Sequence, residues 1–336
     1  MTNWKTQTAQ AVYERTYRRE KPNGELETWP ETVRRVVDGN LALVDPRYIE
    51  QGERERLVEL IEDWKILPAG RHLKASGVSD FALNNCWAAG WNPSDPAEHF
   101  SFVLLRLAEG GGVGSNYSAR YLDEFPAVAV PVQVHIVCDS AHQDYEEMKA
   151  AGLLSEQYAA GWAGAYPVED SRQGWADALA DLIRTAHDPA TRHIARVYDV
   201  SRVRPKGSPL RKFGGSASGP GPLAEMMAKV GEILASKVDV DDDDPAGLRR
   251  LIASPLNGMD AMAIDHEIAR CIVSGGVRRS ARMSIMYWAD PLIDEFMACK
   301  ADQSQHWTTN ISVEVDGSFL AALDAGDISA THILNR

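Results

Sequence analysis

The segment SGGVRRSARMSIMYW, residues 274–288, is the most informative stretch of the chain. It begins where a helical pattern of apolar residues over Met262–Ser274 ends, and it finishes in the run Met283–Trp288, which predicts a strand. The loop between them holds a Gly-Gly pair and three arginines: Arg278, Arg279 and Arg282. A solvated charged face explains this cluster poorly, because the arginines stand between a helix end and a strand. The segment therefore predicts an α/β protein with a functional loop at this junction.

Two further glycine-rich loops occur upstream. Gly110–Gly114 has four glycines in five positions and is followed by Ser115–Ser118, a composition that lets a backbone approach a ligand and present N–H groups to it. Phe213–Pro222 leads into a predicted helix and follows five basic residues: Arg202, Arg204, Lys206, Arg211 and Lys212. Cations, small residues and a helix start together favour a nucleotide phosphate or ribose. A flexible turn is the alternative for the first of these loops.

Composition narrows the class of protein. The 336 residues carry 35 basic and 48 acidic side chains, a net charge of −13, and 44% are hydrophobic, which is ordinary globular usage. No apolar run reaches the roughly 18 residues that a membrane span needs, and the start lacks a signal-peptide pattern. We therefore expect a cytoplasmic protein of one large or two ordinary domains that contacts no membrane. The acidic charge argues against nucleic-acid binding.

The four cysteines predict no metal site. Cys138, Cys271 and Cys299 are widely spaced and have the character of buried small hydrophobic residues. Cys86 differs, because it stands between two asparagines and Trp87, as at the rim of a pocket. The run Asp241–Asp244 lacks the glycine and glutamate of a calcium loop and is interpreted as a solvated linker. The prediction for metal ligands is none.

Local patterns predict the remaining elements. Residues 1–80 are expected to be mostly helical, with one helix starting at Trp29-Pro30. The valine-rich run 126–137 predicts a strand, and 140–165 a helical hairpin. Asp170-Ser171-Arg172 precedes a long helix, and a simple helix cap explains this block as well as a ligand does.

Seven blocks, taken in order, resemble the N-terminal half of the adenosylcobalamin-dependent (class II) ribonucleotide reductases, and in particular the monomeric ribonucleoside-triphosphate reductase type. They are NNCW (84–87), FSF (100–102), GGGVGSNYSAR (110–120), DSRQGW (170–175), RPKGSPLRKFGGSASGP (204–220), SGGVRRSAR (274–282) and HWTTNISVEVD (306–316). Together they extend from about Arg15 to about Val315. Seven ordered blocks are far more specific than any single glycine loop.

The resemblance implies a fold and a domain order. The fold class is α/β: the first half of a ten-stranded α/β barrel, preceded by an N-terminal helical region and carrying an α/β insertion. Residues 1–80 correspond to the helical region and 81–336 to the half-barrel. Residues 122–200 match the insertion that, in the monomeric type, imitates the dimer interface where other reductases bind their effector.

The resemblance also implies site residues. Cys86 matches a redox-active thiol on the first barrel strand whose partner cysteine is not in this chain. Substrate-binding positions are Asn85, Gly111, Gly112 and Asn310. Effector-binding positions are Asp170, Ser171, Arg172, Gly214, Gly215, Ser216, Ala217 and Ser218. A second specificity loop, between effector base and substrate base, is formed by Gly275, Gly276, Val277, Arg278 and Arg279.

The implied activity is reduction of ribonucleoside triphosphates to deoxyribonucleotides for DNA replication, by thiyl-radical chemistry under deoxynucleotide control. The family places the radical cysteine in an Asn-x-Cys-x-Glu pattern that this chain lacks. Adenosylcobalamin is then expected to bind in the missing half. The implied partners are the substrate, a deoxynucleotide effector, a complementary C-terminal half and a thioredoxin-like reductant.

Two other classes of function stay open. One is a nucleotide-binding regulatory module without catalysis. The other is an unrelated α/β enzyme that binds a phosphorylated ligand through its glycine-rich loops, although the scattered histidines offer no nucleophile–base pair.

Overall fold

The computed structural model describes residues 4–78, 83–191, 194–210, 216–241, 250–274, 281–302 and 304–334. The chain forms two compact units. The first comprises Met1–Asn85 with Leu210–Gly214, and the second comprises Cys86–Pro209 with Gly215–Arg336. We describe each unit by itself.

The first unit is helical, as the sequence predicts. Its elements are α1 (Gln7–Val12), the π-helical turn η1 (Tyr13–Tyr17), α2 (Trp29–Leu41), the 3-10 turn η2 (Pro46–Tyr48), α3 (Glu53–Glu62) and α4 (Gly70–Ala75). Helix α2 starts at Trp29-Pro30 because Thr28 and Glu31 form a reciprocal capping box and the proline occupies the first turn. Trp29 then stacks on Trp64 with ring centroids 4.5 Å apart, which anchors α2 in a small core.

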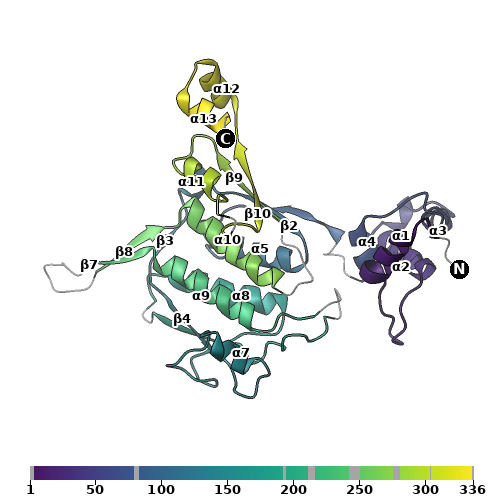
Figure 1. The fold of residues 1–336 in the computed structure, drawn as a ribbon, viewed down its shortest axis with the longest axis horizontal. Helices are drawn as coiled ribbons and strands as arrows, with labels where there is room; N and C mark the ends of the chain where they lie inside the picture. Colours follow the sequence, from purple (N-terminus) through teal and green to yellow (C-terminus); the bar gives the residue numbers. More distant parts are fainter. Residues whose placement is uncertain are drawn as a thin grey trace. The chain divides into compact units, whose positions relative to one another are not determined.

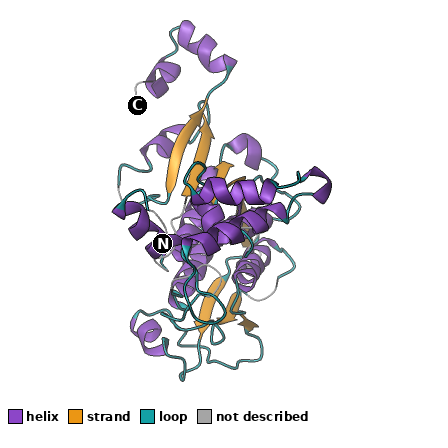
Figure 2. Ribbon diagram, turned by 90° about the vertical axis from the view of Figure 1, so that its right-hand side faces the viewer, coloured by secondary structure: helices purple, strands orange, loops and turns teal. Residues whose placement is uncertain are grey.

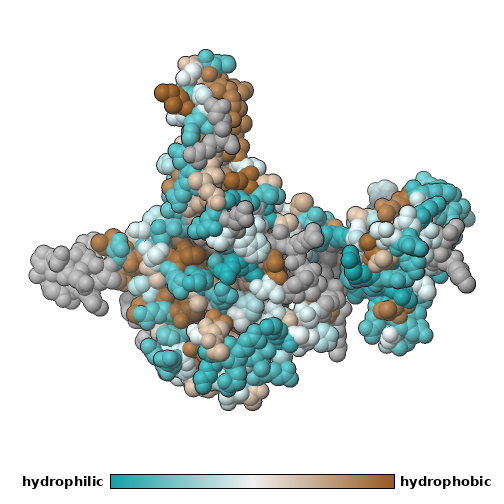
Figure 3. Space-filling view, viewed as in Figure 1, coloured by the Kyte–Doolittle hydropathy of each residue, from teal (hydrophilic) through white to brown (hydrophobic). Residues whose placement is uncertain are grey.

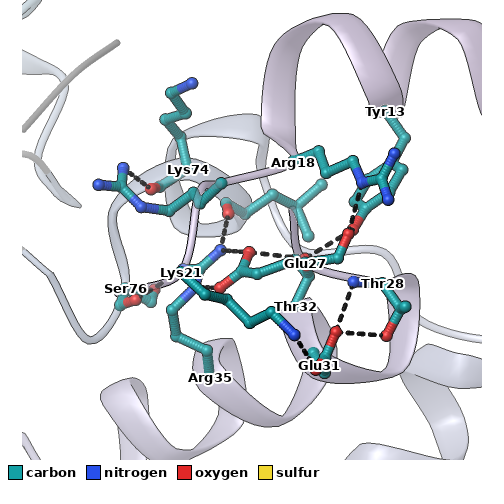
Figure 4. A network of polar contacts seen from close by, with 12 residues as sticks. Tyr13, Arg18, Lys21, Glu27, Thr28, Glu31, Thr32, Arg35, Lys74 and Ser76 are labelled. Carbon is teal, nitrogen blue, oxygen red and sulfur yellow. Dashed lines mark hydrogen bonds and ion pairs between the residues drawn. The ribbon is translucent and has the colours of Figure 1, made fainter. Parts of the chain in front are cut away.

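A buried carboxylate organises this unit (Figure 4). Glu27, which is 7% exposed, accepts hydrogen bonds from Arg35 Nε at 2.6 Å and from Thr32 Oγ1 at 2.9 Å. The same arginine donates to the carbonyls of Leu73 and Ser76 at the end of α4, at 2.9 and 2.8 Å. Glu27 therefore holds Arg35 where it ties α2 to α4.

Four long helices form the core of the second unit: α5 (Glu98–Ala108), α8 (Arg172–His187), α9 (Gly221–Ala235) and α10 (Gly258–Val273). They pack on one another as α5 on α8 and α10, and α9 on α8 and α10. Figures 1 and 2 show this layer between two groups of strands. Its side chains, among them Leu104, Leu179, Met226 and Ile264, are fully buried and make up most of the main hydrophobic core.

One side of the helix layer carries a four-stranded parallel sheet in the order β1-β2-β9-β10. Its strands are β1 (Cys86–Ala88), β2 (Gly112–Asn116), β9 (Ala281–Tyr287) and β10 (Thr309–Glu314). The strands after the first and third glycine-rich loops are thus neighbours. This sheet confirms the α/β class with parallel strands; closure into a barrel stays a prediction.

The other side carries a parallel sheet in the order β4-β6-β5, formed by β4 (Gln133–Val137), β6 (Ala195–Asp199) and β5 (Tyr166–Pro167). A separate antiparallel sheet joins β3 (Ala127–Val128), β8 (Arg250–Pro255) and β7 (Val238–Asp241).

One local prediction in this region is confirmed only in part, and another is wrong. The run 126–137 forms two strands, β3 and β4, because Pro131 interrupts it and cannot donate to a ladder. The expected helical hairpin over 140–165 is only the short helix α7 (Tyr145–Ala150), because Gly152 and Gly161 adopt positive φ angles of 69° and 83° that end or prevent helix.

Short helices complete the second unit: α6 (Ala119–Leu122), α11 (Ile293–Ala298), α12 (Gly317–Asp324) and α13 (Ile328–Leu334). Figure 3 shows hydrophobic atoms on α12 and α13, where Leu320, Ile328 and Leu334 are exposed. Among the residues described, no helix has the length and apolar character to cross a membrane.

Glu27→Ala should destabilise the chain by about 3 kcal/mol, because it leaves Arg35 buried without its counter-charge. Urea denaturation followed by circular dichroism measures this loss. The matched control is Asp38→Ala, which removes an exposed ion pair with Arg54 and should destabilise the chain far less than Glu27→Ala. Equal losses from the two variants would show that Glu27 does not organise the unit.

Candidate functional site

The four strands β1, β2, β9 and β10 are parallel, so their first residues lie along one end of the sheet, which we call its amino edge. Most of the substrate-side candidates lie there. The register places Cys86 opposite Gly112 and Gly112 opposite Ala281, so these residues form one row. In the next row Arg282 lies opposite Thr309, one residue before Asn310. The register thus places Cys86 beside Gly112, whereas Asn310 lies on the other outer strand, β10, two rows further along and opposite Met283.

Cys86 is the first residue of β1 and is an exposed free thiol. The other cysteines are less accessible: Cys138 and Cys271 are buried and Cys299 is partly buried. Burial raises the pKa of the Cys138 thiol to about 11 and also raises the pKa values of Cys271 and Cys299. Since the thiolate is the reactive form, the raised pKa values make Cys138, Cys271 and Cys299 poorly suited to redox chemistry.

The first glycine-rich loop is shorter than the sequence indicates, because Gly112–Asn116 is strand β2 and only Gly110-Gly111 forms the turn. Gly110 has a φ of +73°, which favours glycine. A Cβ on Gly111 would lie 2.9 Å from the carbonyl oxygen of Arg106 and 3.2 Å from the Trp87 ring. This close approach fixes the turn beside β1, which holds Gly112 next to Cys86.

Charged side chains connect this turn to the start of α8. The Arg106 guanidinium lies over the Trp87 ring at 4.8 Å and donates to Glu109 at 2.7 Å. Glu109 in turn lies 3.7 Å from Arg172, one of the predicted effector residues. An ion-pair chain thus joins the residue after Cys86 to the first turn of α8.

A polar network is buried behind the amino edge. Asp265 on α10 accepts from Tyr117 Oη at 2.5 Å and pairs with His99 Nε2 at 2.9 Å, while Arg282 donates to Tyr117 Oη at 2.9 Å. Burial by itself raises the pKa of Asp265, but His99 and Arg282 outweigh that effect and hold it below its ordinary value. Burial raises the pKa of Tyr117. The carboxylate is therefore charged and the phenol neutral near pH 7.

Two histidines extend this network. His266 Nδ1 lies 2.8 Å from Thr308 Oγ1, which also accepts from Arg282 Nη1 at 3.2 Å. The His306 ring lies 5.3 Å from the His266 ring. Burial and nearby positive charge lower the pKa of His266 to about 3 and that of His306 to about 4. Both rings are thus neutral at physiological pH.

Sequence reasoning missed this network. The sequence pattern singles out Arg282 as part of the arginine cluster, but it does not identify Asp265, His99, Tyr117 or His266. Their contacts join residues more than 100 positions apart, and no local spacing reports such pairs.

The predicted effector residues that are described come together through the segment 204–208. Asp170 accepts from Arg204 Nε at 2.8 Å, and Ala217 exchanges backbone hydrogen bonds with Gly207 and Ser208 at 2.9 and 2.8 Å. Ser216 forms a β-bridge with Pro209, and Ser218 follows Ala217. Two blocks separated in sequence thus lie side by side.

Local contacts give part of this region a simpler role. Ser171 caps α8 by accepting from Gly174 N at 2.9 Å, as the helix-cap alternative predicts. Three of the basic residues expected to face a phosphate are paired with carboxylates: Arg202 with Glu169, Arg204 with Asp170 and Lys206 with Glu147. These pairs reduce the positive charge available to a ligand.

Several candidates are not placed at a site by the structure. Asn85 belongs to the first unit, where it accepts from Arg71 Nη2 at 2.7 Å. Gly214, Gly215, Arg211 and Lys212 lie outside the described residues, as do Gly275, Gly276, Val277, Arg278 and Arg279. Within the described ranges, no group of three or more His, Cys, Asp or Glu side chains could hold a metal ion.

Comparisons with known proteins agree on one family. The family model described as "B12-dependent ribonucleotide reductase, insertion domain" matches residues 132–234, and "Ribonucleotide reductase alpha domain" matches residues 2–78. A crystal structure titled as a B-12 dependent (class II) ribonucleotide reductase aligns with a TM-score of 0.75 and 29% identity, covering 94% of this chain and 47% of that one.

Two curated relatives illustrate the similarity. A Mycobacterium phage D29 protein, provisionally named an adenosylcobalamin-dependent ribonucleoside-triphosphate reductase, is 54% identical over 313 residues, covering 93% of this chain and 44% of the relative. The enzyme of that name from Lactobacillus leichmannii is 32% identical over 349 residues, covering 92% and 45%. The chain thus spans about half the length of the curated relatives it matches.

The neutral histidines should make the chain sensitive to acid. Because the folded-state pKa values of His266 and His306 lie below 6.5, the unfolded chain binds protons that the folded chain does not. Their contribution to stability is complete above about pH 6.5 and is lost as the pH falls towards 4, by up to about 1.4 kcal/mol per pH unit for each histidine.

Urea denaturation of wild type and His266→Gln at several pH values measures this contribution. The variant should lose less stability than wild type between about pH 6.5 and 4. A variant whose pH dependence equals that of wild type would contradict the buried neutral assignment.

Proposed function

The chain belongs to the adenosylcobalamin-dependent (class II) ribonucleotide reductase family, and from this premise we propose that it supplies a redox thiol and nucleotide-binding loops for ribonucleoside-triphosphate reduction. The observation that carries the proposal is the row formed by Cys86, Gly112 and Ala281. In this row the exposed thiol of Cys86 lies beside the backbone of Gly112. Next to Gly112 lies Ala281, the first residue of the strand that follows the second specificity loop.

The chemistry requires two thiols. Replacing a ribose 2′-hydroxyl by hydrogen consumes two electrons and two protons, and the hydroxyl leaves as water. Two thiols supply these equivalents and become a disulfide. Cys86 is the one we assign to this chain, because the other cysteines are partly or fully buried with raised pKa values.

Backbone and amide groups are proposed to orient the substrate. Gly111 and Gly112 carry no side chain, Gly112 lies opposite Cys86 in the register, and Asn310 at the second position of β10 offers an exposed amide that donates and accepts. Asn85 is proposed to contribute next to the thiol. Because these groups start rigid strands, they fix the sugar relative to the Cys86 sulfur.

Residues 122–200 are proposed to act as the effector-binding insertion. Asp170, Ser171 and Arg172 would form one side of the site, and Gly214, Gly215, Ser216, Ala217 and Ser218 the other. The contacts of Asp170 with Arg204 and of Ala217 with Gly207 support this arrangement. The second specificity loop, residues 275–279, is proposed to report the effector to the substrate site.

The remaining machinery is proposed to lie in a complementary polypeptide segment. The chain contains no Asn-x-Cys-x-Glu pattern for the radical cysteine. We therefore derive no step through adenosylcobalamin from this chain and assign its binding to the complementary segment. A thioredoxin-like protein would regenerate the dithiol, and a cytoplasmic location would supply that reductant.

The isolated chain should not reduce ribonucleoside triphosphates, because it lacks the radical cysteine. Deoxynucleotide formation is measured with adenosylcobalamin and a dithiol, for the chain alone and for the chain combined with a segment carrying the missing pattern. Turnover is expected only in the combination. Nucleotide binding by the combination without turnover would instead favour a regulatory module.

Cys86→Ser should abolish dithiol-dependent turnover in the combined enzyme while leaving its nucleotide affinity unchanged. Cys299→Ser is the matched control, since it removes a partly buried thiol and should cost only on the order of 1 kcal/mol of stability. Retention of dithiol-dependent turnover by Cys86→Ser would refute the redox assignment.

A further inference from the structure

We propose that Asp265, Arg282 and Thr308 form a positioning unit that sets the amino ends of β9 and β10 and so affects which nucleotide base is accepted. The inference rests on the proposed function. It assigns these residues no contact with substrate; they act through the residues that follow or precede them in the chain.

Burying this unit costs free energy, because its charged groups are removed from water. Asp265 is 0% exposed, Arg282 3% and His99 2%. Charged groups at such depth are commonly less stabilising than apolar residues of similar size, so their presence favours a role in selecting one arrangement over others. Among the described residues, Oδ1 of Asp265 also has no hydrogen-bond donor, which leaves half of the carboxylate unsatisfied.

Arg282 ties two strand starts together. Its Nη1 donates to Thr308 Oγ1 at 3.2 Å, and its backbone lies opposite Thr309 in the sheet. In the sequence, Arg282 comes three residues after Arg279 of the predicted specificity loop, and Thr308 comes two residues before Asn310. One guanidinium therefore links the strand after the specificity loop to the strand that carries a substrate candidate.

Helix α10 holds the other side of this link. Asp265 lies 3.7 Å from Arg282 Nη2, and its neighbour His266 contacts Thr308 at 2.8 Å, so adjacent residues of one helix contact both strand starts. Helix α10 packs along α9, to which Arg270 is tied by a 2.8 Å ion pair with Glu225.

The link reaches towards the effector side. Helix α9 begins at Gly221, three residues after Ser218 of the first specificity loop. A small shift of α9 carried to α10 would change the contacts of Asp265 and His266 with the strand starts. Because packed helices and buried ion pairs adopt discrete arrangements, this route can couple the two sites.

The test uses the full reductase, formed from this chain and the complementary segment. Thr308→Val removes the shared hydroxyl and keeps the buried pair of Asp265 with Arg282, so it should fold. Thr331→Val is the control, because this residue lies outside the proposed sites and its hydroxyl donates to a nearby backbone carbonyl, that of Asp327 at 2.9 Å. Arg282→Lys adds a variant that keeps the charge but loses the two-pronged donor.

The measured quantity is the ratio of kcat/KM for two ribonucleoside triphosphates with one deoxynucleoside triphosphate bound. In Thr308→Val and Arg282→Lys this ratio should fall about tenfold, through KM, while effector affinity stays within about twofold of wild type. Thr331→Val should keep the wild-type ratio.

A uniform loss of kcat/KM for both substrates, with the ratio unchanged, would mean a merely structural role and would overturn the inference. An unchanged ratio in Thr308→Val, in an enzyme whose wild type turns over, would overturn it as well and leave the proposed function standing. Absence of turnover in the wild-type combination would contradict the proposed function, and the inference would fall with it.

Discussion

The backbone register of the parallel sheet is the constraint on which the rest of the site depends. Parallel strands cannot be joined by tight turns, so each pair requires a long crossover, here supplied by helices such as α5 between β1 and β2. Once the strands align, Cys86, Gly112 and Ala281 are fixed in one row regardless of their separation in sequence. The site that we propose lies at the amino ends of these strands, whereas near their carboxyl ends Asn116 donates to Glu314 at 2.7 Å.

The region consists of an exposed amino edge and a buried charged network that supports it. The exposed thiol of Cys86 lies at the edge, whereas the neighbouring helices bury the charges of Asp265 and Arg282. Such charges are stabilised only when their partners stay in place, which makes the support specific about geometry. The first unit uses the same device, because Glu27 holds Arg35 against the end of α4. In both units a buried carboxylate positions an arginine that ties separate elements together.

Much of the fold could be predicted from local sequence patterns. The helix starts at Trp29 and Ser171 follow capping chemistry, and the strand after Arg282 follows alternation. The hairpin expected over 140–165 failed because glycines with positive φ outweigh a helical composition. The ordered motifs gave the family, whereas the pairing of Cys86 with Gly112 and the contacts of Asp265 are products of tertiary packing that no local window contains. The prediction that the basic residues before Phe213 face a phosphate is weakened, because Arg204 and Lys206 pair with carboxylates. A sequence does not reveal which carboxylate a basic residue will contact.

The central claim is that the amino edge of the sheet carries one of the two thiols that reduce the nucleotide. It is tested most directly by one round of turnover without external reductant, followed by mass spectrometry of the cysteines. The account predicts that Cys86 enters a disulfide with one cysteine of the complementary segment, in proportion to the deoxynucleotide formed, while Cys138, Cys271 and Cys299 stay reduced. Product formed while Cys86 remains a free thiol would contradict it.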